Sequence, residues 1–130
     1  MRFLLICLGG ALGTGLRYLI SGSLAQWLGP GFPYGTLTVN VVGSLAIGVI
    51  QEVGTTSLLI PDAARLFLTV GVMGGLTTYS TFSYETVKLV ESGAWHEAWL
   101  NVAGTTAVCL ACCFLGIALG RGVLGLRAGG

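Results

Sequence analysis

The sequence has 130 residues and 8% of them are charged, whereas soluble domains carry roughly 25%. With 54% hydrophobic residues and a mean hydropathy of +0.88, a small soluble domain is excluded, because it could not bury so much apolar surface. The net charge of +1 provides no basic surface for phosphates, which excludes a nucleic-acid-binding protein. We therefore predict an all-α integral membrane protein embedded in the lipid bilayer.

Long intervals without charged residues predict the first two membrane crossings. Apart from Arg17, residues 3–51 carry no charge, and about 20 apolar residues suffice to cross a bilayer core. The Gly- and Pro-rich turn 29–33 divides this interval, because helix interiors avoid such residues. We expect crossings over about 3–27 and 35–53. A cleaved signal peptide at the start is the competing interpretation, but Arg17 within the apolar stretch favours a retained helix.

The second half of the chain contains two further charge-free intervals of membrane-spanning length. Pro61 followed by Asp62 is typical of a helix start, since proline suits the first turn and an acid complements the helix dipole. We expect crossings over about 62–90 and 95–120, joined to the others by short polar turns. The whole chain, 1–130, is then a single four-helix membrane domain.

Basic residues differ by only a few between the two ends of this predicted bundle, and the side of Arg17 is left open by the sequence. An even number of crossings places both termini on one side, together with Arg2, Arg65, Arg121 and Arg127, while Lys88 lies on the other. By the positive-inside rule this bias favours cytoplasmic termini only weakly. So small a margin is compatible with insertion in both orientations.

Glycine is unusually frequent, with 22 of 130 residues. Three glycine pairs have the spacing that lets membrane helices approach closely: Gly9 and Gly13, Gly71 and Gly75, and Gly116 and Gly120. The sequence leaves open whether these pairs pack helices within one chain or between two chains. We favour an oligomer, because a bundle of this length has little interior in which to build a pathway.

The third predicted crossing contains the most informative segment of the chain. Gly74 and Gly75 are followed by five Ser and Thr residues within 77–83. One such residue commonly bonds back to a carbonyl of its own helix, but five beside a glycine pair predict a helix that breaks inside the membrane. Broken backbone at that depth needs to be buried in protein or to line a wet cavity. Its carbonyls and helix ends can then bind ions.

Two other crossings carry polar residues one helical turn apart. These stripes are Thr36, Asn40 and Ser44 in the second crossing, and Asn101, Thr105, Cys109 and Cys113 in the fourth. A membrane-buried amide is costly unless it is hydrogen-bonded, which favours a lined pathway. Since no stripe residue is ionised, such a lining would bind a small anion weakly enough to release it. Packing is favoured over metal or redox chemistry for the cysteines, because no His or acid stands near them.

Two aromatic residues follow the predicted break. Tyr79 and Phe82 are three positions apart, so both project from one helix face. Their ring edges carry partial positive charge and suit an anion, because the ring quadrupole is negative on the face and positive at the rim. Ordinary packing of the two rings is the alternative, and the residues alone leave both interpretations open.

Three motifs resemble the Fluc/CrcB family of fluoride channels. They are Gly13-Thr-Gly-Leu-Arg17, Gly35-Thr-Leu-Thr-Val-Asn40 and Gly74-Gly-Leu-Thr-Thr-Tyr-Ser-Thr-Phe-Ser83, and the length and four-crossing layout also agree. The resemblance implies an antiparallel, dual-topology homodimer in the cell (inner or plasma) membrane. Its two pores would export cytoplasmic fluoride passively and so relieve fluoride toxicity. A structural sodium ion (Na+) would lie at the dimer centre.

The resemblance also implies roles for individual residues. Asn40 would donate to fluoride in the pore. The other pore residues would be Phe82, Tyr79, Ser80, Thr36, Thr105, Cys109 and Cys113. Backbone carbonyls of Gly74 and Thr77 would hold the sodium ion, while Arg17 and Glu85 would lie at a vestibule or support the structure.

This chain departs from the family pattern at two places. Tyr79 stands where the family usually has phenylalanine, so a hydroxyl is added to the first of the two aromatics. Cys109 and Cys113 stand in the family's track of hydroxyl residues, and thiols are weaker donors. We therefore expect weaker fluoride binding or slower conduction in that half of the pathway.

Three other functional classes fit the sequence less well than a channel does. A small multidrug-resistance type exporter, also with four crossings, needs an intramembrane carboxylate in its first helix, and residues 3–27 contain no Asp or Glu. An intramembrane enzyme needs a nucleophile and a base, and the single histidine, His96, lies at a predicted helix entrance. A purely structural packing subunit would leave the two polar stripes and the break without a purpose.

Overall fold

Every regular element that the structure describes in the computed structural model is a helix, as predicted. The described residues are 1–129, and the side chains of 127 and 128 are not among them. The side chain of Arg127, predicted among the basic residues at the terminal side, therefore lies outside the described part of the chain.

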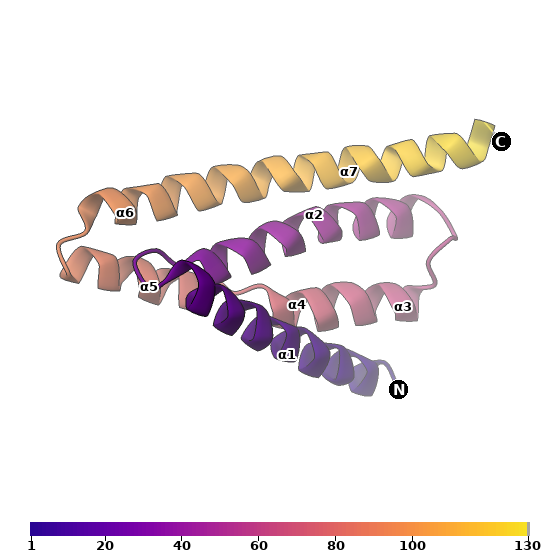
Figure 1. The fold of residues 1–130 in the computed structure, drawn as a ribbon. Helices are drawn as coiled ribbons and strands as arrows, with labels where there is room; N and C mark the ends of the chain where they lie inside the picture. Colours follow the sequence, from indigo (N-terminus) through magenta and orange to yellow (C-terminus); the bar gives the residue numbers. More distant parts are fainter. Residues whose placement is uncertain (130) are drawn as a thin grey trace.

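The helices run back and forth along the length of the molecule (Figure 1). α1 (Arg2–Leu28) leads into α2 (Tyr34–Thr56), and the chain finishes in a long rod formed by α6 (Trp95–Trp99), η2 (Leu100–Gly104) and α7 (Thr105–Gly129). Both termini lie at the same end of the molecule, near the turn that follows α2. This is the arrangement that an even number of membrane crossings requires.

Three helical stretches of the described chain are long and apolar enough to cross a membrane. They are Arg2–Leu28, Tyr34–Thr56 and Trp95–Leu126. Their apolar side chains largely face outward: Phe3 on α1 is 75% exposed and Phe114 on α7 is 76% exposed. Such an apolar exterior suits lipid or a second protein surface, and it would be unfavourable in water.

The segment predicted as the third crossing is divided among several shorter elements. They are α3 (Asp62–Leu66), the π-helix η1 (Phe67–Met73), α4 (Gly74–Leu76) and α5 (Ser80–Glu91). α4 ends because Thr77 has extended backbone angles, φ −85° and ψ 156°. Helical geometry resumes only at Ser80, so residues 77–79 lie between two helices.

Glycines end two of the helices. Gly29 follows α1 and Gly93 follows α5, each with a φ of 81°. That left-handed conformation is accessible to glycine because it has no Cβ. The chain can therefore reverse direction at both places within a few residues.

Close glycine contacts join the helices into two layers. α1 packs along η1 and α4, and α2 packs along α7. In the first contact a Cβ on Gly9 would lie 3.1 Å from the Cα of Gly71, and in the second a Cβ on Gly116 would lie 3.2 Å from the Cα of Gly48. Residues from all three predicted glycine pairs thus pack helices within one chain.

Candidate functional site

A pocket of about 410 Å³ opens between α2, the third segment and α7. We call it the central pocket. It brings together seven of the predicted site residues, namely Asn40, Gly74, Thr77, Tyr79, Phe82, Thr105 and Cys109. Ser44, from the stripe on α2, also lines it. None of the described residues that line this pocket is charged at neutral pH, so its polarity comes from amide, hydroxyl and backbone groups.

Asn40 is bound to the non-helical segment by two hydrogen bonds. Its Nδ2 donates to the carbonyl oxygen of Thr78 at 3.1 Å, and its Oδ1 accepts from the Thr78 N–H at 2.8 Å. These bonds fix the orientation of the amide, because exchanging its nitrogen and oxygen would lose both. An amide nitrogen carries two hydrogens, so one remains for a further acceptor.

The same contacts leave carbonyl groups of the third segment without their usual helical donors. The N–H of Thr78 bonds to Asn40 and not to Gly74, four residues earlier. The N–H of Thr81 bonds to the hydroxyl of Thr78 at 3.1 Å and not to the carbonyl of Thr77. Carbonyl oxygens are ligands that hard cations accept. The oxygens of Gly74 and Thr77 therefore have the chemistry expected for a sodium ion.

The two aromatic residues lie together at the pocket but differ in exposure. The ring centroids of Tyr79 and Phe82 are 5.6 Å apart, with the ring planes tilted by 49°. Phe82 is 9% exposed, whereas Tyr79 is 80% exposed in the single chain. The tilted geometry is a common arrangement of paired aromatic rings, and both residues line the central pocket.

Arg17 and Glu85, the two residues predicted for a vestibule, line a separate pocket of about 640 Å³. Thr36, which was predicted for the pore, belongs to this second pocket as well. Thr36 donates to a carboxylate oxygen of Glu85 at 2.5 Å, and the Nε of Arg17 donates to the carbonyl of Gly75 at 3.0 Å. Thr36 thus lies with Glu85 and not in the central pocket.

Comparison with known proteins agrees with this arrangement. The family model described as CrcB-like protein, Camphor Resistance (CrcB), matches residues 4–117. The chain belongs to the CrcB family. A relative from Geobacter metallireducens, named fluoride-specific ion channel FluC, is 53% identical over 116 residues, which cover 89% of this chain and 94% of the relative.

Two other CrcB relatives carry the same name. The protein from Trichlorobacter lovleyi is 53% identical over 113 residues, covering 87% of this chain and 88% of the relative. The protein from Anaeromyxobacter dehalogenans is 48% identical over 124 residues, covering 95% and 98%. With its apolar helices, this CrcB chain is a multi-pass membrane protein.

A network of hydrogen bonds that reaches the backbone of Phe82 was not predicted from the sequence. Asn101, only 1% exposed, donates to the hydroxyl of Thr86 at 2.9 Å and accepts from Thr105 at 3.1 Å. Thr86 in turn donates to the carbonyl of Phe82 at 2.8 Å. These hydrogen bonds connect η2 to α5 and so support the Phe82 backbone. The polar stripe that contains Asn101 indicated a role for that residue, but nothing in the sequence indicated its partner Thr86.

Besides Thr36, two more predicted pore residues lie outside the central pocket of this CrcB chain. Ser80 is exposed at the start of α5, and Cys113 is part of α7 without lining the pocket. Residues four apart on an α-helix are rotated by about 40°, because each residue turns about 100°. From Thr105 to Cys113 the rotation accumulates to about 80°, so a stripe of this spacing leaves the pocket after Cys109.

Proposed function

We propose that this CrcB chain forms a fluoride-selective channel that exports cytoplasmic fluoride by passive electrodiffusion and lowers its toxicity. The observation that carries this proposal is the central pocket, where the oriented Asn40 amide and the Phe82 ring meet in an uncharged lining. The relatives named fluoride-specific ion channel FluC support the choice of ion. The channel would act in the cell (inner or plasma) membrane.

In the proposed mechanism a dehydrated fluoride ion enters the central pocket and accepts the second amide hydrogen of Asn40. The bonds from Asn40 to Thr78 hold this donor in place, so no reorganisation is needed when the ion arrives. The edge of the Phe82 ring supplies a second, weaker attraction. Binding by dipoles without a fixed positive charge lets the ion leave again, as conduction requires.

We further propose that the third crossing is broken within the membrane and that two chains assemble as an antiparallel homodimer. Residues 77–79 are non-helical, and their neighbours Gly74 and Ser80 are exposed in the single chain. Lipid cannot satisfy such backbone groups, so a second copy is the cover that fits. The margin of only a few basic residues between the two sides supports insertion of the two copies in opposite orientations.

The proposed dimer would hold a structural sodium ion through the carbonyl oxygens of Gly74 and Thr77. Both oxygens lack their usual helical donors because of the contacts of Thr78 and Thr81. The ion would neutralise the dipoles of these carbonyls and hold the non-helical segments of the two copies together. Arg17 and Glu85 would line the proposed vestibule next to this segment.

Fluoride efflux from proteoliposomes tests the proposed function. With purified protein inserted in the vesicles, a fluoride electrode is expected to record rapid efflux, while chloride efflux stays at the level of protein-free vesicles. Protein that is inserted and dimeric but gives no fluoride-selective efflux would refute the channel.

We expect Cys109→Ser to increase the fluoride efflux rate about fivefold. Cys109 lines the central pocket, and a hydroxyl is a stronger donor than a thiol. A typical net hydrogen bond contributes about 1 kcal/mol, which corresponds to about a fivefold change. Cys113→Ser is the matched control and should leave the rate unchanged, since Cys113 lies outside the pocket. An unchanged rate for Cys109→Ser would exclude the Cys109 side chain from the pathway.

A further inference from the structure

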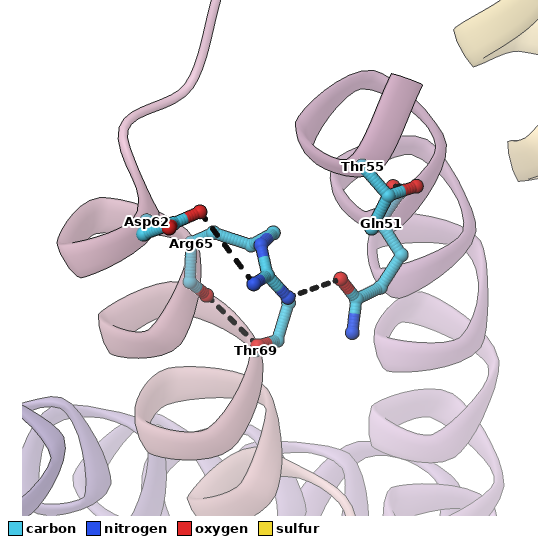
Figure 2. Close-up of polar contacts among 5 residues, drawn as sticks. All are labelled: Gln51, Thr55, Asp62, Arg65 and Thr69. Carbon is cyan, nitrogen blue, oxygen red and sulfur yellow. Dashed lines mark hydrogen bonds and ion pairs between the residues drawn. The ribbon is translucent and has the colours of Figure 1, made fainter. Parts of the chain in front are cut away.

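A second polar cluster lies at the end of the molecule that carries the termini, away from the residues proposed for the pore. Figure 2 shows its centre, where Arg65 of α3 extends toward Gln51 of α2. The Nη1 of Arg65 donates to the Gln51 side-chain oxygen at 3.2 Å. Its Nη2 lies 3.7 Å from a carboxylate oxygen of Asp62, whose side chain is 69% exposed.

The guanidinium of Arg65 is incompletely satisfied by these partners. Its Nε is buried and has no hydrogen-bond partner among the described residues. A buried donor without an acceptor is costly, and more so on a charged group. Asp62 is a weak partner, because it is largely exposed and its oxygen is beyond hydrogen-bonding distance. The Nη2 of Arg65, which has only this weak ion pair within the described part of the chain, therefore retains capacity for an anionic acceptor.

Arg65 also stands between the central pocket and the aqueous end of the molecule. Thr69, one turn after Arg65, lines the central pocket, and its hydroxyl donates to the Arg65 carbonyl at 2.8 Å (Figure 2). On α2, Gln51 lies one turn beyond Ile47, which also lines that pocket. On its other side Arg65 lines a pocket of about 480 Å³, which we call the mouth pocket, together with Asp62, Thr55 and Ser57.

Gln51 fixes the position of this guanidinium. Its side-chain oxygen accepts from the Nη1 of Arg65, so its amide nitrogen does not face Arg65. Thr55 donates to the Gln51 backbone carbonyl and helps to keep that turn of α2 regular. A guanidinium held in one position is a charged donor group suited to a small anion.

We propose that Arg65, positioned by Gln51, forms an anion-recruiting site at the terminal-side mouth of the pathway, and that its ligand is fluoride. This inference rests on the proposed channel function. Asp62 competes with fluoride for the guanidinium, so the ion exchanges with a carboxylate and is not trapped. The described residues that line the central pocket carry no charge, and the Arg65 cation supplies the long-range attraction that this lining lacks.

Fluoride-dependent stabilisation of the purified protein in detergent tests the site directly. Thermal unfolding is followed while sodium fluoride replaces sodium chloride at constant ionic strength, since a ligand that binds the folded state raises its stability. We expect Arg65→Gln to raise the half-saturating fluoride concentration about tenfold. Asp62→Asn should lower it, because the competing carboxylate is removed, and Arg65→Lys should fall between wild type and Arg65→Gln.

Arg121→Gln is the matched control. Arg121 is exposed and binds Glu52 at 3.0 Å, so removing it should leave the half-saturating concentration unchanged. Equal concentrations in wild type, Arg65→Gln and Asp62→Asn would overturn the site. If Arg65→Gln does not yield folded protein, Asp62→Asn decides alone, and an unchanged value there has the same consequence.

Efflux measurements on the same variants separate this site from the channel itself. Wild-type efflux without any dependence on Arg65 would refute the recruiting site and keep the channel. Binding that depends on Arg65 without wild-type efflux would refute the channel and keep the anion site.

Discussion

Aspartate in place of Asn40 is expected to lower fluoride efflux about a thousandfold. A carboxylate about 4 Å from the ion repels it by about 4 kcal/mol at an effective dielectric constant of 20. Since about 1.4 kcal/mol corresponds to a factor of ten, the reduction amounts to about three orders of magnitude. Efflux from proteoliposomes with matched protein content measures it.

The structure adds a second consequence to this substitution. Aspartate still accepts from the N–H of Thr78, but its other oxygen faces the Thr78 carbonyl to which Asn40 donates. Two facing oxygens repel, so the substitution also loosens the non-helical segment. Thermal unfolding of the variant is therefore measured together with efflux, to separate loss of fold from loss of conduction.

Asn40→Ala is the matched control, because it removes both bonds to Thr78 without adding charge. We expect about a tenfold loss of efflux, since one donor to the ion disappears. A similar loss in the alanine and aspartate variants would show that charge at this position does not matter. Unchanged efflux in both variants would instead place the pathway away from Asn40.

The ends of the helices were accessible from the sequence because they depend on local chemistry. The Gly- and Pro-rich turn 29–33 separates α1 from α2, and Pro61 directly precedes α3. The interruption before Ser80 follows a glycine pair and a run of hydroxyl residues, which is also a local signal. By contrast, the division of the third segment into a π-helix and short α-helices depends on packing against α1, which no local pattern encodes.

The hydrogen-bonding partners within the site could not be predicted from the sequence in the same way. Asn40 and Thr78 are 38 residues apart, and their contact depends on how far α2 is shifted along the third segment. Polar residues spaced four apart do not all face the same pocket. Thr36 has this spacing from Asn40, yet it binds Glu85. The chemistry of the pocket lining was predictable from the residue types, whereas the pairing of side chains depends on the relative positions of the helices.

Gly116→Ala is expected to destabilise the fold by about 2–3 kcal/mol, the upper part of the usual cost of overpacking. A Cβ at this position would meet the carbonyl oxygen of Leu45 and would lie 3.1 Å from the nitrogen of Val49. These are backbone atoms of α2, so no side-chain rotation can make room. α7 would have to move away from α2, which would widen the central pocket that both helices line.

Gly122→Ala on the same helix is the matched control, and its stability is expected to change in the opposite direction or not at all. No atom lies within 4 Å of a Cβ built there, so only helix propensity changes, and alanine is favoured over glycine by about 1 kcal/mol. Thermal unfolding in detergent should therefore show a lower midpoint for Gly116→Ala and an unchanged or higher midpoint for Gly122→Ala. If Gly116→Ala is as stable as wild type, then α2 and α7 are not held at backbone contact. The width of the pathway would in that case depend on contacts other than those between Gly116 and the α2 backbone. The proposed second copy of the chain is the candidate to supply them.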